Sequence, residues 1–420
     1  MDRRRSERIT PQKLAEVARE YYFRDRTQSD IAASERVNQT TIAHWIAEAH
    51  KQGIVAIDID PDFALTGYEH ADLSRRLRNA FNLYDCLVVD PADPTLYDDG
   101  KSDKLHTVIA NVSGSKLREW LRSGDHIAIG GGRAPMRVAR FIRRNPSSRS
   151  EIRISPLSGR IWIGSWQEAG ADNLQRPLDA DDAARMLALA YEHEPGTRFS
   201  QIGRPLYAES REIAQRIIVQ ECAFQPGGRW RDDIQPPRCA LVGIGALHPG
   251  SGHRISELLD SPETRTVTHL DWAAGKYRAA IAFTIERKLK HFGDVANRLF
   301  PVVPLPSELR KTPRPSRADY DKLRQQLDEL NHQAIVMEWE HLRKTPSVWA
   351  IAGGRLKLHA LWTLLICRRF ERDRSRSLIK ELSVDLRTAQ SLENALNDFD
   401  NASNAIQNWY AEICPRIFGS

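Results

Sequence analysis

The sequence predicts an α/β protein with two parts. The first is an N-terminal helix-turn-helix (winged-helix-like) domain, and the second is a larger Rossmann-like domain built on a parallel sheet. The first 53 residues contain three short helical patterns, each preceded by a capping residue. From residue 72 onward, helical patterns alternate with short apolar runs, as in a parallel sheet flanked by helices. With 420 residues, the chain is too long for one small core.

The composition predicts a water-soluble cytoplasmic protein. Hydrophobic residues make up 41% of the chain, and the net charge of +6 permits a polyanionic partner without requiring one. There is no apolar window long enough for a membrane span, and no apolar run follows the basic start as in a secretory signal. The five cysteines are scattered without a Cys-x-x-Cys pair, which favours reduced thiols over disulfides or a metal site.

The N-terminal sixty residues have the layout of a DNA-reading unit. We expect a first helix over 11–24, a short second helix capped by Thr27, a third helix over 39–52 capped by Asn38, and a short strand or wing over 54–59. This layout, in which a short helix and a tight turn lead to a capped helix with a polar first turn, is typical of proteins that place a helix N-terminus in the major groove of DNA.

Candidate DNA contacts follow from this layout. Gln28 would lie near phosphates, and at the start of the third helix Gln39, Thr40 and His44 would face base edges. Asn38 and Thr41 are further candidate DNA-binding residues. Residues 1–53 carry ten Lys or Arg against eight Asp or Glu, so two such units would have to pair on a palindrome to bind well. The alternative is a helical bundle that packs on the rest of the chain or on another protein.

The larger part alternates between helices and strands. Ligands of such sheets bind beyond the carboxyl ends of the strands. Helices are predicted over 73–81, 105–122 and 134–143, and strands over 85–89, 126–129, 152–154, 240–245 and 348–352.

Glycine-bearing strand ends mark a candidate pocket. Gly131 and Gly132 precede Arg133 at the start of a helix, where glycines let the backbone approach an anion and the guanidinium adds a charged partner. A second glycine turn at 353–354 leads to Lys357, near the place where a phosphate would bind. Each turn could equally be a bare strand-helix connection with a solvated cation.

Two carboxylates and one further glycine complete the candidate site. Asp294 and Asp385 each follow a short apolar run, where a carboxylate either accepts hydrogen bonds from sugar hydroxyls or caps the next helix. Gly245 ends a third glycine-bearing strand. No catalytic residue, metal ligand or cofactor is predicted.

Several short motifs occur in a fixed order. The N-terminal ones are Tyr21-Tyr22, Thr27-Gln28-x-x-Ile31-Ala32, Thr41-Ile42 and the Gly-Ile-Val of 53–55. The later ones lie at 130–133, 156–159, 243–245, 293–294, 352–357 and 385–389. Together they run from about 12 to 396. In this pattern the chain resembles SorC-type (DeoR-like) sugar-responsive transcription regulators.

The resemblance implies a function. It adds Tyr22 to the DNA-binding residues and implies an effector domain similar to the folds of ribose-5-phosphate isomerase and glucosamine-6-phosphate deaminase, which binds a phosphorylated sugar without turning it over. Arg133 and Lys357 would flank the phosphate, while Asp294 and Asp385 would hold hydroxyls. It further implies homodimers or homotetramers in which the effector alters the binding of double-stranded operator DNA.

The chain departs from the family pattern at several positions. Ala134, followed by Pro135, replaces the threonine after Gly-x-Gly-Arg, so one phosphate-binding hydroxyl is missing. Arg36 stands at the usual turn glycine and Glu35 at the usual leucine before it, while His44 takes the place of a common basic residue. The identities of the operator and the effector therefore stay open.

The predicted domains are 1–60 for DNA binding and 68–400 for effector binding and oligomerisation, with a proline-rich insert at 301–330 and a tail at 401–420. The apolar residues of the tail would pack on the core or on a second subunit. Two alternatives remain for the whole chain. One is a sugar-phosphate isomerase- or deaminase-like enzyme with a helical appendage, and the other is a regulator of this fold that acts without an effector.

Overall fold

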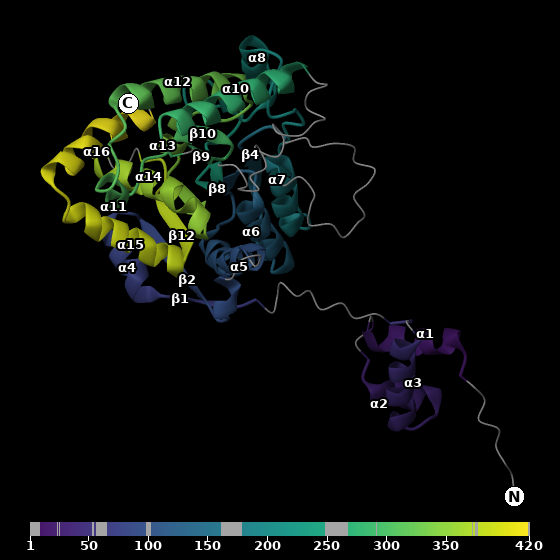
Figure 1. Cartoon of the computed structure of the whole chain (residues 1–420). Coiled ribbons are helices and arrows are strands. Elements are labelled where there is room, and N and C mark those ends of the chain that lie inside the picture. The colour runs from purple at the N-terminus through teal and green to yellow at the C-terminus, as the bar shows by residue number, and fades with distance from the viewer. Residues whose placement is uncertain are drawn as a thin grey trace, which may run out of the picture. The chain divides into compact units, whose positions relative to one another are not determined.

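The computed structural model divides the chain into two compact units, Met1–Ala64 (the small unit) and Leu65–Ser420 (the large unit) (Figure 1). The predicted wing at 54–59 lies outside the described residues beyond Val55. The structure describes residues 9–22, 24, 26–52, 54–55, 65–97, 102–160, 179–247, 268–290, 292–371, 373 and 377–418.

The small unit contains the three predicted helices, α1 (Pro11–Tyr22), α2 (Gln28–Glu35) and α3 (Gln39–Lys51). Apolar residues at helical spacing, among them Val17, Ile31 and Ile42, form its buried core. The helical prediction for this segment is therefore confirmed.

The large unit is built on a ten-stranded, mostly parallel sheet. Its main path runs in the order β1, β2, β12, β11, β8, β3, β4, β5, and the remaining hairpin joins through β9, which pairs with β8. The strands are β1 (Gly67–Glu69), β2 (Asp85–Pro91), β3 (His126–Ile129), β4 (Arg153–Pro156), β5 (Arg198–Phe199), β8 (Cys239–Leu247), β9 (Phe292–Val295), β10 (Arg298–Pro301), β11 (Ser347–Ile351) and β12 (Glu381–Asp385). A separate two-stranded ribbon consists of β6 (Phe224–Gln225) and β7 (Arg229–Trp230).

The predicted α/β fold class is confirmed, but the sheet is not wholly parallel. β1 runs antiparallel to β2, and β9 runs antiparallel to β8. The second exception belongs to a hairpin. β9 and β10 form a hairpin across a two-residue turn, Ala296 and Asn297, both with positive φ, which matches the twist of an antiparallel pair.

Helices cover both faces of the sheet because its strands are apolar on both sides. Along β2, Cys86 and Val88 join one buried cluster, whereas Leu87 and Val89 join the other. The second cluster is covered by α5 (Ser102–Trp120), α6 (Arg133–Arg144) and α7 (Ala180–Ala188), which lie together in Figure 1. The first contains residues of α4 (Ala71–Ala80), α10 (Thr268–Glu286), α12 (Arg317–Gln333), α13 (Trp339–Lys344), α14 (Leu358–Arg369), α15 (Leu386–Asp400) and α16 (Asn404–Ile417). The remaining helical segments are α8 (Arg211–Glu221), α11 (Pro306–Leu309) and the 3₁₀ turns η2 (Pro94–Tyr97), η3 (Leu189–Tyr191) and η5 (Arg355–Lys357).

The predicted insert and the tail pack against each other. The tail helix α16 contacts α12 and α14. The Trp409 indole donates to the Pro315 carbonyl at 2.9 Å, and the Tyr410 hydroxyl donates to that of Pro304. The apolar side of the tail thus lies on its own chain, which resolves the choice that the sequence left open.

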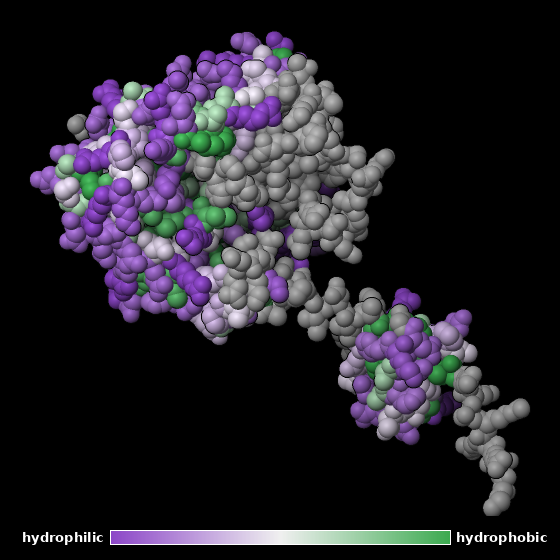
Figure 2. All heavy atoms as spheres, in the orientation of Figure 1, coloured by the Kyte–Doolittle hydropathy of each residue, from purple (hydrophilic) through white to green (hydrophobic). Residues whose placement is uncertain are grey.

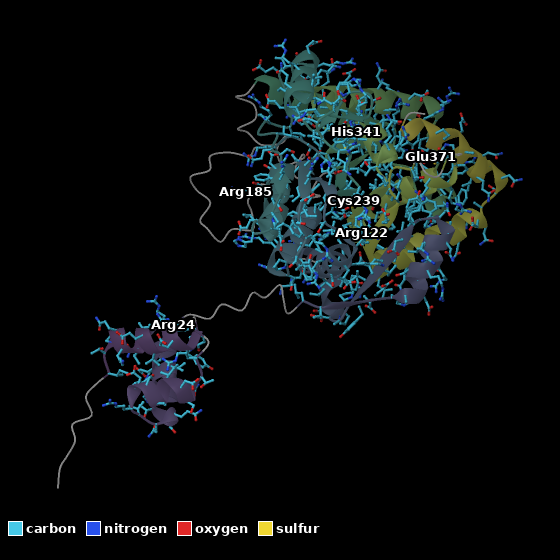
Figure 3. All side chains as sticks on the ribbon, turned by 180° about the vertical axis from the view of Figure 1, so that it is seen from behind. Arg24, Arg122, Arg185, Cys239, His341 and Glu371 are labelled. Carbon is cyan, nitrogen blue, oxygen red and sulfur yellow. The ribbon has the colours of Figure 1, made fainter. Side chains whose placement is uncertain are left out.

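The described surface is mostly hydrophilic (Figure 2), and the thiols are buried. Hydrophilic residues dominate the described part of the face in Figure 2. All five cysteines are buried and free, including Cys239 at the start of β8 (Figure 3). Among the described residues, no helix combines the length and the apolar character that a membrane span requires.

Candidate functional site

The helix-turn-helix of the small unit is held by two side-chain caps. Thr27 accepts the N–H of Asp30 at 3.2 Å at the start of α2. Asn38 accepts both the N–H and the hydroxyl of Thr41, at 2.7 and 2.6 Å, at the start of α3. Both predicted caps are confirmed, and each satisfies a helix N–H that has no partner within the helix.

The turn between α2 and α3 explains the glycine that SorC-type sequences carry there. Arg36 has φ 56° and ψ 39°, in the left-handed region, and its N–H points back to the last carbonyls of α2. A side chain with a Cβ costs roughly 1 kcal/mol in this conformation, whereas glycine adopts it freely. The chain keeps the turn geometry in spite of the substitution.

One face of α3 is available to a partner. Gln39, Thr40 and His44 are exposed, whereas the side chains of Asn38 and Thr41 bond to each other as the cap. Lys51 is exposed on the same side, eleven residues after Thr40. The helical period of the sequence could have identified Lys51 as a further candidate contact.

The other predicted DNA residues lie at helix ends. Tyr22 ends α1, and its hydroxyl hydrogen-bonds His50 Nε2 at 2.7 Å, which joins α1 to the last turn of α3. Gln28 is the first residue of α2, beside helix N–H groups that suit a phosphate. Just beyond α1, the exposed Arg24, labelled in Figure 3, pairs with Glu20 at 2.7 Å.

In the large unit, the predicted glycine turns meet at one edge of the sheet. The parallel strands β12, β11, β8 and β3 are neighbours in that order, so their carboxyl ends lie side by side. After β3 the chain enters residues 130–132 and then α6; after β11 it enters residues 352–354 and then η5. This is the edge at which ligands of parallel sheets bind.

Glycines at this edge permit close approach between segments. A Cβ on Gly243 would lie 3.2 Å from the Pro135 ring, and one on Gly130 would lie 3.0 Å from the Ala296 methyl. A Cβ on Gly353 would lie 2.4 Å from Ile109. Gly131 is buried, whereas a Cβ on Gly132, which has φ 110°, would meet nothing within 4 Å among the described residues.

Asp385 is bound within the protein by backbone groups. One carboxylate oxygen accepts the N–H of Thr388 at 2.9 Å and caps α15, while the other accepts the N–H of Gly354 at 2.8 Å. The Thr388 hydroxyl lies 3.1 Å from the same Gly354 nitrogen. Asp385 is fully buried, so it fixes the turn after β11 to the start of α15.

Asp294 lies on β9, directly opposite Gly245 of β8. It is buried and accepts the N–H of Asn297 at 2.9 Å. The Asn297 amide then donates to the hydroxyl of Ser158, just after β4, at 2.8 Å. The hairpin turn is thereby connected to a second strand end at this edge.

Lys357 of η5 brings several predicted residues together. Burial and the guanidiniums of Arg133 and Arg137 lower the pKa of Lys357 to about 8, while the Asp294 carboxylate acts in the opposite direction. Arg133 and Asp294, which come from different segments, therefore act electrostatically on Lys357, and we call these three residues the charged cluster. Arg137 was missed, although its position one turn after Arg133 on α6 was the available signal.

The start of α6 has fewer hydrogen-bond donors than a typical anion site. Gly132 precedes the helix and provides no side-chain cap, so the first N–H groups of α6 receive no side-chain acceptor from this position. Ala134 supplies no hydroxyl, and Pro135, the third residue of the helix, has no N–H. Within the part of the chain that the structure describes, no group of three or more His, Cys, Asp or Glu side chains could hold a metal ion.

Comparisons with known proteins found sequence similarity to two transcription regulators over about a third of this chain. No family model matches the chain. It is 26% identical over 147 residues to the sorbitol operon regulator of Klebsiella pneumoniae and 22% identical over 144 residues to the uncharacterized transcriptional regulator YjhU of Escherichia coli (strain K12). These matches span 35% and 34% of this chain, and 43% and 41% of the two relatives, which is less than half their lengths.

The solved structures give the same picture for the fold. A transcriptional regulator from Streptococcus pneumoniae superposes with a TM-score of 0.50 at 14% identity, over 77% of this chain and 96% of that one. The full-length sorbitol operon regulator SorC from K. pneumoniae gives 0.49 at 18% identity, over 92% of this chain and 99% of that one. The resemblance to SorC-type regulators is confirmed at the level of sequence similarity, over 35% of the chain.

Proposed function

We propose that the chain is a DNA-binding transcription regulator whose operator binding is modulated by a small phosphorylated sugar or a related metabolite. The observation that carries the ligand part is the cluster of Arg133, Lys357 and Asp294 at the carboxyl edge of the sheet. Cations suit a phosphate and a carboxylate suits hydroxyls. The capped helices of the small unit and the regulators among the relatives support the DNA part.

The DNA part requires more than one small unit. Its first 53 residues carry a net charge of only +2, so phosphate contacts from one copy give weak binding at physiological salt. Two copies on a palindromic site double those contacts and double the base readout. We therefore propose a homodimer or homotetramer acting on double-stranded DNA in the cytoplasm.

The test is binding of the full chain to duplex DNA from upstream of its own gene, measured by fluorescence anisotropy with and without a panel of sugar phosphates. We expect specific retention and a shift in affinity with one class of sugar phosphate. Turnover of a sugar phosphate without DNA retention would instead favour the isomerase- or deaminase-like enzyme. Retention that no metabolite changes would favour a regulator that acts without an effector.

Base readout by α3 has its own test. His44→Ala and Gln39→Ala remove exposed side chains at the helix start and should weaken binding to the operator by roughly 1–3 kcal/mol, with a smaller loss on random DNA. Ser29→Ala, a change on α2, is the matched control. Equal losses on both kinds of DNA would refute base contacts at these two positions.

A further inference from the structure

One face of helix α10 is exposed on the large unit. The helix lies beside α12 (Figure 1), and its inner side buries Ala273, Tyr277 and Ala280 in the core. The exposed residues recur at intervals of three and four positions, as one side of a helix requires. They are Gly275, Arg278, Ala279, Ala282, Ile285 and Glu286, and we call them the α10 face.

Two residues of the α10 face have no evident purpose within the described part of the chain. Gly275 lies inside the helix, where glycine is less favourable than alanine. Its φ is not positive, and an added Cβ would meet nothing within 4 Å among the described residues. Ile285, near the other end of the face, is 61% exposed. Both residues have a role if a second surface packs closely on this face.

The charges of the α10 face are placed symmetrically about Ala282. Arg278 lies four residues before Ala282 and Glu286 four residues after it, so the three side chains form one row along the helix. Helices whose rows of this kind interdigitate cross at about 50°, the most common packing angle in globular proteins. If two copies of α10 run in opposite directions and cross at Ala282, the Arg278 of each copy meets the Glu286 of the other. Such reciprocal contacts are what a two-fold interface requires.

The contacts that these side chains make within their own chain do not prevent this pairing. Glu286 pairs with the adjacent Arg287 at 3.3 Å, in side chains that are 66% and 49% exposed, and Arg278 also interacts within the chain. Exposed ion pairs contribute little to stability, so either residue can exchange its partner at small cost. The short side chain of Ala282 lets the two helix axes approach closely. Ala279 and Ile285 then lie on either side of the crossing point.

Resting on the homodimer proposed above, we propose that the α10 face is the centre of a two-fold interface between the large units of two copies of this chain. The partner is a second copy because opposite charges at equal distances from a small central residue complement themselves only under two-fold symmetry. This interface needs neither DNA nor effector, so the two copies associate before they meet an operator.

The first test measures self-association of the full chain without DNA by sedimentation equilibrium over a range of concentrations. Arg278→Glu and Glu286→Arg each place like charges opposite one another twice, so each should weaken association by about tenfold or more. The double variant restores opposite charges and should return to within about threefold of the wild type. Gln390→Arg, an exposed change on α15, is the control and should have no effect. Thermal unfolding checks that every variant is folded.

The second test locates the symmetry axis. Ala282→Cys places two thiols at the crossing point, where diamide should join them rapidly by accepting their two protons and two electrons. A disulfide needs Cα atoms within about 7 Å, so only residues beside the axis can form it between identical chains. The five native cysteines are buried and should not react. A non-reducing gel should show a covalent dimer for this variant but not for the control, Gln390→Cys.

The outcomes separate this interface from the proposed function. If the wild type associates, the charge variants associate equally well and Ala282→Cys gives no covalent dimer, the α10 face is refuted and the proposed homodimer stands on another surface. Weakened single variants without recovery in the double variant would overturn the two-fold pairing. A wild type that stays monomeric, both alone and on operator DNA, would remove the interface and the proposed homodimer together.

Discussion

Two strand-to-helix turns of the large unit, residues 130–133 and 353–357, have similar glycine-rich sequences but different hydrogen bonding. After β11, the Gly354 N–H is bound by the Asp385 carboxylate. After β3, Gly132 precedes α6 with no side-chain cap. Both turns precede their helix without a side-chain cap, but the turn after β11 has a backbone N–H bound by a carboxylate and carries the Lys357 side chain.

This difference assigns separate roles to similar motifs. A carboxylate beside a glycine turn can either meet a ligand or hold the turn, and Asp385 does the second because backbone N–H groups occupy both of its oxygens. Asp294 also accepts one backbone N–H, but it acts electrostatically on Lys357 across the site. Four experiments test the contrast between the two turns, and they follow in order of expected effect.

The largest effect is expected from Lys357→Ala. If Lys357 of the second turn binds the ligand, the variant should lose the response of DNA binding to sugar phosphate. It should still bind DNA in the absence of the metabolite. Anisotropy titrations with and without the metabolite measure both quantities. Arg355→Ala, an exposed cation in the same 3₁₀ turn, is the control. An unchanged response in Lys357→Ala would remove this residue from the site.

Asp385→Ala tests whether this carboxylate holds the turn. It leaves the N–H groups of Gly354 and Thr388 without their carboxylate in a buried place, so the free energy of unfolding should fall by about 3 kcal/mol. Urea unfolding measures the change. Asp400→Ala, at the exposed end of the same helix, removes a surface pair with Arg369 and should cost less than about 1 kcal/mol. Equal losses in the two variants would contradict a supporting role.

The two ends of β12 allow a related test, because Glu381 begins the strand that Asp385 ends. Burial raises the pKa of Glu381 to about 7. A carboxyl whose pKa is raised on folding lowers stability as pH rises from about 4.5 through 7. Glu381→Gln should therefore stabilise the protein by about 2 kcal/mol at pH 8 and leave it unchanged at pH 4. Urea unfolding at both pH values measures this, with Glu412→Gln, an exposed position on α16, as the control. A gain that is the same at both pH values would argue against titration of Glu381.

The smallest effect is expected at the first turn. Pro135→Ala restores one N–H at the start of α6, so sulfate affinity should rise by about threefold, the scale of one modest hydrogen bond. Calorimetry measures the change, with Pro146→Ala just beyond the helix as the control. Unchanged or weaker binding would show that the amides at this helix start do not contact the anion.

Much of the local structure followed from the sequence. Caps at Thr27 and Asn38, the strand at 126–129 and the alternation of helices with buried strands were predictable because each depends on neighbours within a few residues. The hairpin at 292–301 was not predicted. Its turn uses Ala296 and Asn297 in place of the usual Asn-Gly signal, so only the pairing of β9 with β10 in the folded chain reveals it.

For the candidate site, too, some features follow from the sequence and others depend on the folded chain. The residues that could hold an anion are identifiable from the sequence alone, since glycines before a helix and a nearby cation are local signals. Which of them meet depends on the folded chain, because the order of β12, β11, β8 and β3 brings together segments that are far apart in the sequence, such as those of Arg133 and Lys357, which are 224 positions apart. The fold also makes Asp385 the support of a turn and adds Arg137 to the charged cluster, since burial and electrostatic proximity arise from packing between distant elements.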